Sequence, residues 1–485
     1  MNRPVKKKLY IDIAERVISL IDRGVLKQGD KVPSIREFSQ QLGISKNTIK
    51  ESYWYLESKH YIEAVPQSGF YVNNLNTGIK PAVHDNGIIK ENKEIEDYLV
   101  NSAKTSMCRI YGALGKHGYY SPEIELGIAS LPNSLWPVGK LNKYFQEAQR
   151  HEHNEAYNYN ITPGYWPLRE QISLHAMKAG YILKPEEVII TNGCSEAIYL
   201  ALCTICKPGD AIAVESPLYF NFLKVCEKMK LNIIEIPNSS ERGINLDTLQ
   251  FVINKYKISA LLAIPTFNNP NGSCMTEPDK EKLVHMLEKH NIPLIEDDIY
   301  AELYYSGKRP KPCKAFDQKG NVILCSSFSK TIAPGIRLGW IAPGKYYNDI
   351  DELKLLFNIG TSTLPQIAIS KYLRDGGFDR HLRNVRRIVE KNVIQMRETI
   401  IGHFPAGTEV SLPLGGFVLW VKLPEKVNSI LLYEILLREK IIIAPGDHFS
   451  ISGNYMNYFR INASQWNETV YNAVIRIAVA VKKML

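Results

Sequence analysis

The feature that most limits the fold of this chain is a series of five apolar runs, each four to seven residues long, between residues 188 and 326. Runs of this length that are rich in Val, Ile and Leu predict strands buried on both faces. The stretches between them have helical periodicity, and strands that alternate with helices predict a mostly parallel sheet covered by helices on both sides. The runs are 188–191, 211–215, 259–265, 292–297 and 322–326.

The first 75 residues have a different, mainly helical pattern. An apolar stripe from residue 10 onward predicts an amphipathic helix that ends near Gly24. Ser34, with Glu37 three positions later, predicts a capping box at the start of a second helix, which ends at Gly43. Ser45 is expected to cap a third helix.

Two strand-like runs, 61–65 and 69–72, follow the third helix and predict a hairpin. Three helices followed by a hairpin form a winged helix-turn-helix, which we expect over residues 1–75. A helix that enters the DNA major groove needs short polar and basic side chains in its first turn and an apolar back. The third helix has such a back in Ile49, Tyr53 and Leu56, and its other face carries Ser45, Lys46, Asn47, Thr48 and Lys50.

Charge gives weak additional support for DNA binding. The chain has a net charge of +9, and the first 75 residues hold 12 Lys and Arg against 8 Asp and Glu. Arg36, at the start of the second helix, and the hairpin tip up to Gly69 are candidates for phosphate contacts. A three-helix unit with a wing is also used for protein docking, so the pattern alone favours DNA without excluding that alternative.

Length and composition point to several domains in a cytoplasmic protein. A chain of 485 residues with 45% hydrophobic residues exceeds one typical domain. Residues 76–120 lack apolar periodicity and are expected to form a linker. The remaining chain, 121–485, is expected to contain a large part at about 165–355 and a small part at about 365–485. No apolar run is long enough for a membrane helix, so we expect no membrane partner.

Cysteine usage indicates reduced thiols and gives no reason to expect a metal. The eight cysteines are scattered, unlike the dense framework of a small secreted domain. Cys203 and Cys206 have the spacing of a metal or redox pair, but they lie in an apolar run without a second ligand pair. We expect a buried structural role for both.

Polar residues gather where the predicted strands end. In open α/β sheets, ligands bind beyond the carboxyl ends of the strands. The strand ends here are followed by 192–195, by 268–272, by Asp297 with Tyr300, and by Ser327 with Lys330. A lysine buried at such an edge is costly unless its charge is removed, for example in a Schiff base.

Two sets of motifs resemble known families. S-F-S-K-T-I-A-P-G-I-R-L-G-W, E-D-D-I-Y and F-N-N-P-N-G are similar to motifs of fold-type I enzymes that use pyridoxal 5′-phosphate (PLP), the aminotransferases. G-D-K-V-P-S-I-R-E-F and I-S-K-N-T-I-K resemble the GntR family of regulators. Together they resemble the MocR-type subgroup, which implies a winged helix-turn-helix joined to a large, mostly parallel α/β domain and a smaller C-terminal α+β domain.

The resemblance assigns roles around the PLP ring. It implies that Lys330 forms the Schiff base, called the internal aldimine, and that Asp297 pairs with the pyridine nitrogen. Tyr300 and Asn269 would hydrogen-bond the ring oxygen, and Tyr219 would stack on the ring.

It also assigns the groups that bind the two anionic parts of the ligands. The cofactor phosphate would take backbone N–H groups of Cys194 and Ser195, with Ser327 and Arg337 completing the site. Arg460 would hold the carboxylate of an effector. The family's phosphate site also takes a tyrosine from the neighbouring subunit, here Tyr159, which implies a homodimer, most plausibly with exchanged subunits.

Three positions depart from the family pattern. The segment Ser130-Leu131-Pro132 has Ser130 where a glycine is frequent, which narrows the substrate side. Glu196 brings a negative charge near the expected phosphate, so we expect its side chain to point away. Lys46 stands where an arginine is frequent, which retains phosphate binding but alters base preference.

The sequence therefore predicts a PLP-dependent, DNA-binding transcription regulator that senses an amino acid or related amino compound through an external aldimine. Loss of the Lys330 link would shift the small part and reposition the DNA-binding heads. One alternative is an active aminotransferase with an accessory DNA-binding domain, since the residues for half-transamination are present. The other is a regulator that senses PLP itself.

Overall fold

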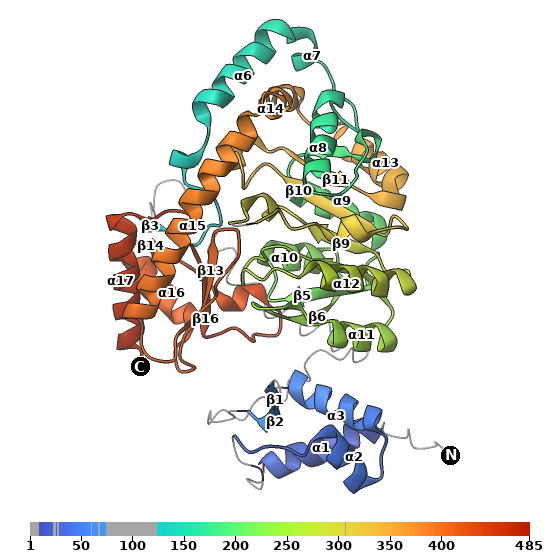
Figure 1. Ribbon diagram of the computed structural model, residues 1–485, viewed down its shortest axis with the longest axis vertical. Coiled ribbons are helices and arrows are strands. Elements are labelled where there is room, and N and C mark those ends of the chain that lie inside the picture. The colour runs from blue at the N-terminus through green and yellow to red at the C-terminus, as the bar shows by residue number, and fades with distance from the viewer. Residues whose placement is uncertain are drawn as a thin grey trace. The chain divides into compact units, whose positions relative to one another are not determined.

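The computed structural model describes residues 9–22, 26, 29–59, 61–65, 68–73, 124–305 and 307–485. The chain divides into two compact units, one within its first 88 residues and one after them. The predicted linker, residues 76–120, and its two predicted boundaries lie outside the described residues, as does Gly24 near the predicted end of the first helix. The relative positions of the two units are not determined (Figure 1).

The N-terminal unit contains the predicted three helices and hairpin. They are α1 (Leu9–Asp22), α2 (Ile35–Leu42), α3 (Lys46–Ser58), β1 (Ile62–Val65) and β2 (Gly69–Val72). The two strands pair antiparallel, with Ile62 opposite Val72. The winged helix-turn-helix order is confirmed.

Local hydrogen bonds explain where these helices start and end. Ser34 Oγ accepts from the backbone N–H of Glu37 at 3.2 Å, and the Glu37 carboxylate accepts from Ser34 N at 2.8 Å, which is the predicted capping box. Gly43 ends α2 in the left-handed region at φ +65°. Ser45 Oγ accepts from Thr48 N at 3.2 Å and caps α3.

The three predicted apolar residues of α3 are buried in the core of this unit. Ile49, Tyr53 and Leu56 pack with residues of α1, including Ile13 and Val17. The hydroxyl of Tyr53 donates to the carbonyl of Pro33 at 2.6 Å, so the buried ring keeps its polar end bonded. The apolar back of α3 is thereby fixed and its first turn is left at the surface.

The second unit is built on an eight-stranded sheet (Figure 1). The strands from β9 to β6 run parallel to one another, while β11 is antiparallel to β4 and β10. The five predicted strands are all present; β6, β7 and β11 were not predicted. In spatial order the strands are β4 (Ile189–Thr191), β11 (Gly339–Ala342), β10 (Val322–Ser327), β9 (Leu294–Asp297), β8 (Ile258–Ala263), β5 (Ala211–Ser216), β6 (Asn232–Ser239) and β7 (Gly243–Ile244).

Helices cover both faces of this sheet, as the alternation predicted. Ile212 and Val214 of β5 point into the core that contains α9 and α10, whereas Ala211 and Ala213 point into the core that contains α11 and α12. Side chains of neighbouring strand residues point to opposite faces, so each strand contributes to both cores. These helices are α9 (Cys194–Ile205), α10 (Phe220–Lys228), α11 (Leu246–Lys255) and α12 (Glu277–Lys289).

A second, four-stranded antiparallel sheet forms the smaller part of this unit. Its order is β12 (Glu409–Val410), β13 (Val418–Lys422), β16 (Tyr458–Asn462) and β15 (Ala444–Pro445). It is accompanied by α15 (Gly377–His403), α16 (Ser429–Arg438) and α17 (Glu468–Lys483). The first described strand of the unit, β3 (Ile124–Glu125), pairs in parallel with β14 (Ile441–Ile442) and so joins this smaller part.

The remaining helices are α6 (Val138–His151), α7 (His153–Tyr157), α8 (Trp166–Lys178), α13 (Tyr347–Asn358) and α14 (Thr363–Arg374). No helix in the described part of the chain is long and apolar enough to cross a membrane. Cys206 is buried and Cys203 is partly exposed, so the expected burial holds fully for one of the two. No group of three or more His, Cys, Asp or Glu side chains that could hold a metal comes together in the residues described.

A buried ion pair fixes α13 against the start of α9. The fully buried Lys354 donates to Glu196 at 2.8 Å, and Glu196 also accepts from Asn358 at 2.8 Å and from the backbone of Asn192 at 2.5 Å. The Glu196 side chain is therefore occupied by α13 and points away from the cavity, as expected from the sequence.

We predict that Glu196→Ala destabilises this unit by about 3–5 kcal/mol, because Lys354 would remain buried without its counter-ion. Chemical denaturation followed by tryptophan fluorescence measures the change. Lys143→Ala, which breaks an exposed pair with Glu147, is the matched control and should change stability by less than about 0.5 kcal/mol. A change of similar size in both variants would contradict this interpretation.

Candidate functional site

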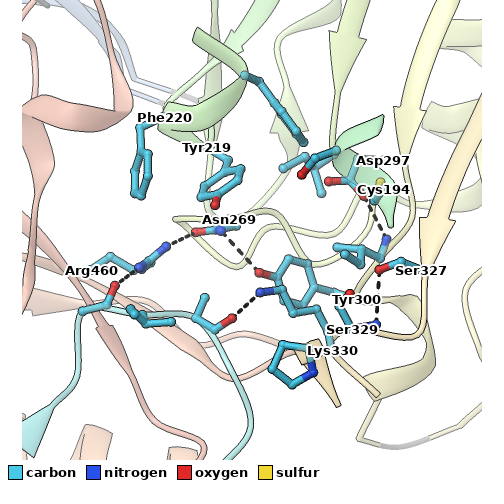
Figure 2. A pocket seen from close by; sticks show the side chains of 18 of the residues that line it. Cys194, Tyr219, Phe220, Asn269, Asp297, Tyr300, Ser327, Ser329, Lys330 and Arg460 are labelled. Atoms are coloured by element: carbon cyan, nitrogen blue, oxygen red, sulfur yellow. Dashed lines mark hydrogen bonds between the residues drawn. The ribbon is translucent and has the colours of Figure 1, made fainter. Parts of the chain in front are cut away.

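The ends of β4, β8, β9 and β10 meet at a cavity of about 190 Å³ (Figure 2). Every cofactor or effector residue predicted from the sequence except Tyr159 lines it. The lining residues are Gly127, Ile128, Ala129, Cys194, Ser195, Tyr219, Phe220, Phe222, Ile264, Asn269, Asp297, Ile299, Tyr300, Ser327, Ser329, Lys330, Pro334, Arg337 and Arg460.

Lys330 supplies an amine at the wall of the cavity. It lies in the turn after β10, and its Nζ donates to the backbone carbonyl of Ala129 (Figure 2). Burial lowers the pKa of Lys330 to about 8, and the positive charges of Arg460 and Arg337 lower it further while Asp297 opposes them. Because no carboxylate forms an ion pair with it among the described residues, the amine can lose its proton near neutral pH and act as a nucleophile.

Asp297 supplies a buried carboxylate at the end of β9. Its Oδ1 accepts from the Cys194 thiol at 3.3 Å and from the backbone N–H of Ile299 at 3.1 Å. Burial raises the pKa of Asp297 to about 7. No lysine, arginine or histidine in the described ranges forms an ion pair with it, so this carboxylate is suited to a cationic ligand group such as a protonated ring nitrogen.

An anion-binding site lies where α9 begins. Gly193 precedes the helix at φ +87°, and a Cβ at this position would lie 2.7 Å from Nη2 of Arg337. The absence of a side chain thus lets the Arg337 guanidinium lie against the helix start, where it donates to the carbonyl of Asn192 at 3.0 Å. No side chain of the described residues caps α9, so its first N–H groups are available to an anion.

Ser195 and Ser327 line the cavity with these groups. Ser327 follows β10 directly and its Oγ accepts from the backbone of Ser329 at 3.3 Å. Two serines, a guanidinium and a helix N-terminus form a donor set suited to a phosphate.

Asn269 connects Tyr300 to Arg460 at the opposite side of the cavity. Its Nδ2 donates to the Tyr300 hydroxyl at 3.3 Å, and its Oδ1 accepts from Nη1 of Arg460 at 2.9 Å (Figure 2). Nη2 of Arg460 donates to the carbonyl of Gly127, and the guanidinium lies 5.2 Å from the ring centre of Phe449. Burial raises the pKa of Tyr300, which keeps its hydroxyl protonated as a hydrogen-bond donor.

Aromatic rings form the wall next to Arg460. Tyr219 precedes α10, and its ring centre lies 4.7 Å from that of Phe220 and 5.3 Å from that of Phe222. Phe220 in turn contacts Phe449 of the smaller part at 5.4 Å. Tyr219 is therefore held at the cavity by a cluster that spans both parts of the unit.

Tyr159 does not line the cavity. It is 79% exposed in the loop between α7 and α8, so the structure of one chain does not bring it to the other predicted residues. Other large apolar side chains of this region are exposed as well, namely Tyr157, Ile161, Trp166, Leu356 and Phe357. The contribution of Tyr159 to a neighbouring subunit stays a prediction.

The predicted DNA contacts lie in the N-terminal unit. Arg36, Ser45, Lys46, Asn47 and Lys50 are exposed. Thr48 is partly buried and its hydroxyl lies 2.8 Å from that of Ser45, while Lys50 Nζ lies 4.5 Å from the ring centre of Trp54. Gly69 begins β2 at φ +120°.

The sequence did not predict the wall formed by Gly127, Ile128 and Ala129. This segment is held by the smaller part, because Asn462 donates to the carbonyls of Ile128 and Ser130, each at 2.7 Å. The pairing joins residues more than 330 positions apart, and no local pattern indicates it. The Ser130 departure was the one local signal near the segment.

Comparison with known proteins agrees with this geometry. The profile of aminotransferase class I and II matches residues 132–477, and that of the bacterial regulatory proteins of the gntR family matches residues 9–72. An Escherichia coli K12 protein called uncharacterized HTH-type transcriptional regulator YjiR is 32% identical over 98% of this chain and 99% of its own. The HTH-type transcriptional regulator NorG of Staphylococcus aureus USA300 is 30% identical over 94% of this chain and 100% of its own.

Solved structures match the second unit. The kynurenine aminotransferase of Pyrococcus horikoshii is 26% identical, with a TM-score of 0.73 over 79% of this chain and 95% of its own. The multiple substrate aminotransferase of Thermococcus profundus is also 26% identical, with a TM-score of 0.72 over 79% and 96%. This fold class generally uses PLP. The chain therefore belongs to the MocR-type regulators, in which a gntR-family DNA-binding domain is joined to an aminotransferase class I and II domain.

Proposed function

We propose that this protein is a DNA-binding transcription regulator that holds PLP at Lys330 and responds to an amino acid at the same site. The observation that carries the proposal is the content of one cavity: an amine of lowered pKa, a buried carboxylate without an ion-pair partner in the described chain, an anion site and a buried arginine. The gntR-family domain supplies the DNA-binding function.

The donor set of the cavity fits PLP. Lys330 would hold the aldehyde carbon, Asp297 the ring nitrogen, and Tyr300 with Asn269 the ring oxygen. The helix start at Cys194 and Ser195, with Ser327 and Arg337, would hold the phosphate, and Tyr219 would cover the ring. When bound, PLP supplies an electrophilic carbon at which one amine can replace another.

Arg460 is suited to the carboxylate of the effector. Its guanidinium is planar, buried and only 1% exposed, and such a fork matches a carboxylate bidentately. Around it the described lining is apolar, with Ile128, Ala129 and Phe220. We therefore expect an effector with one amine, one carboxylate and an uncharged side chain.

The contacts of the wall segment support a conformational response. In the structure, Lys330 donates to Ala129 and Arg460 donates to Gly127, so the two ligand-binding cations hold the same three-residue segment. An amino acid whose carboxylate engages Arg460 competes with the Gly127 carbonyl. Because this segment follows β3, which pairs with β14, a shift of the segment would be passed to the smaller part.

A homodimer fits the exposed apolar surface around Tyr159. Tyr157 and Tyr159 are 74% and 79% exposed, which is unusual for large aromatic side chains of one region. A second copy of the chain would cover this surface and bring Tyr159 to its phosphate site. Subunit exchange of the DNA-binding heads remains part of the proposal.

One observation favours the alternative of an active aminotransferase. Lys330, Asp297 and Arg460 are all present and line one cavity, so the groups needed for amino transfer are in place. Turnover of an amino donor with a 2-oxo acid acceptor, without any effect on DNA binding, would support that alternative.

We predict that Lys330→Ala removes the response to amino acids, because the amine that holds the cofactor is lost. The measurement is a gel-shift titration on DNA upstream of the protein's own gene, with the visible absorbance of the cofactor recorded in parallel. Lys345→Ala, which changes an exposed lysine outside the cavity, is the control. A full amino-acid response in Lys330→Ala would refute the sensor proposal.

A second prediction concerns pH. The neutral amine is the nucleophile, so cofactor capture by the cofactor-free protein should accelerate about tenfold per pH unit below the pKa of Lys330 and level off above it. With the pKa at about 8, the plateau begins there, whereas an ordinary lysine of pKa 10.5 would not reach one below pH 10. Stopped-flow absorbance between pH 6 and 10 distinguishes the two. A rate that still rises steeply at pH 10 would show that the pKa is not lowered.

The DNA contacts give a third prediction. Lys46→Ala should weaken binding on all DNA sequences and reduce the slope of log K against log salt by about 1, because one phosphate contact is lost. Lys46→Arg should retain the slope, since the charge is kept. Fluorescence anisotropy at several salt concentrations measures both, and an unchanged slope in Lys46→Ala would remove this residue from the DNA interface.

A further inference from the structure

A buried carboxylate outside the cavity holds the loop that carries Asn269. Glu215 lies near the end of β5, is 1% exposed and is not among the residues that line the cavity. The proposed function gives it no role. Its hydrogen bonds nevertheless lead to the arginine that is suited to the effector.

All three hydrogen bonds of Glu215 come from neutral donors. Oε1 accepts from the backbone N–H of Ile264 at 2.5 Å and from Nδ2 of Asn268 at 2.7 Å, and Oε2 accepts from Nδ2 of Asn238 at 2.5 Å. No lysine or arginine of the described residues forms an ion pair with it. Burial raises the pKa of Glu215 to about 7, and the hydrogen bonds act against this rise.

The two asparagines are bonded at both ends of their amides. Asn238 Oδ1 accepts from Asn271 Nδ2 and from Ser273 Oγ, each at 3.0 Å, and Asn268 Oδ1 accepts from Asn271 N at 3.2 Å. Neither amide can turn over without losing these bonds, so each presents its NH₂ group to Glu215. A buried carboxylate is the acceptor that this arrangement requires.

This network supports a strained loop. Phe267 has φ +54°, a left-handed conformation that is unfavourable for a bulky residue and needs support from its surroundings. Asn268 follows it and is tied to Glu215, and Asn269 comes next with Oδ1 at 2.9 Å from Arg460 Nη1. One residue therefore separates the buried carboxylate's contact from the contact to the arginine.

We propose that Glu215 is a positioning residue for the effector carboxylate, which it acts on through Asn268, Asn269 and the orientation of Arg460. This inference rests on the proposed function. Two bonds, to Asn269 and to Gly127, fix the plane of the Arg460 guanidinium, and bidentate binding of a carboxylate depends on that plane. When Glu215 is absent the loop loses its acceptor, and the Asn269 contact to Arg460 loosens.

The test compares ligands with and without a carboxylate. The probes are L-alanine, L-leucine and L-phenylalanine, each paired with its decarboxylated amine: ethylamine, 3-methylbutylamine and 2-phenylethylamine. Dissociation constants are measured on the full-length, PLP-loaded protein from the visible absorbance of the cofactor. For Glu215→Ala we expect the amino-acid constant to rise about tenfold or more and the amine constant to change less than about twofold.

Two variants provide the controls. Glu215→Gln keeps an oxygen for Ile264 and Asn268 and loses the acceptor for Asn238, so an intermediate rise of about threefold in the amino-acid constant is expected. Asp317→Ala removes another buried carboxylate, which accepts from the backbone of Lys319, Asn321 and Val322 and contacts no residue of the 266–274 loop. It should destabilise the protein without changing the ratio of the two constants.

The outcomes separate the two proposals. If amino-acid and amine constants rise together in Glu215→Ala, or if neither moves, Glu215 has only a structural role and the inference is wrong. If Glu215→Ala does not fold, as judged by its thermal midpoint, Glu215→Gln decides by the same ratio. If the wild-type protein binds none of the probes while taking up PLP, the proposed effector class fails, whereas failure to take up PLP contradicts the proposed function itself.

Discussion

Lys330 and Asp297 are two ionisable side chains that the sheet buries at its carboxyl edge without an ion-pair partner in the described chain. Burial of such groups costs free energy, and here it moves both pKa values toward neutrality. The rest of the site depends on this constraint. A ligand that offers a carbonyl carbon to the amine and a cationic ring nitrogen to the carboxylate relieves both costs at once.

The two parts of the second unit share the work of building this site. The eight-stranded sheet supplies the lysine, the carboxylate and the anion site from the ends of its strands. The smaller part supplies Arg460 from β16 and holds the wall at 127–130 through Asn462. Because ligand groups come from both parts, occupancy of the site is coupled to their relative position, which is the property that a sensor requires.

Sequence patterns predicted the strands and helices that position the site, with particular exceptions. The strand β11 begins with Gly339 and has only four residues, and β6 contains Pro237 and alternates polar with apolar residues, so neither has the continuous apolar run of the other strands. Lys330 and Asp297 were predictable because each directly follows such a run. The α3 cap and apolar back were also predictable, since they depend on residues within one helix.

The parts of the site that escaped prediction depend on contacts between distant residues. Arg460 could be assigned only by resemblance, because an arginine in a short strand is usually exposed and paired. The wall at Gly127 and Ala129 depends on β3 pairing with β14, over 300 residues later. Glu215 resembles any strand-end glutamate in the sequence, and only the structure shows that its acceptors face Asn238 and Asn268.

The central claim, that the cofactor cavity and the DNA-binding domain are coupled, is tested most directly by reciprocal linkage. The amino-acid dissociation constant is measured from cofactor absorbance with and without saturating operator DNA, and the DNA constant with and without saturating amino acid. Thermodynamic linkage requires both constants to change by the same factor, and the account predicts a factor clearly different from one. A factor of one in both titrations, with steady consumption of the amino acid and a 2-oxo acid, would contradict the sensor and identify an aminotransferase instead.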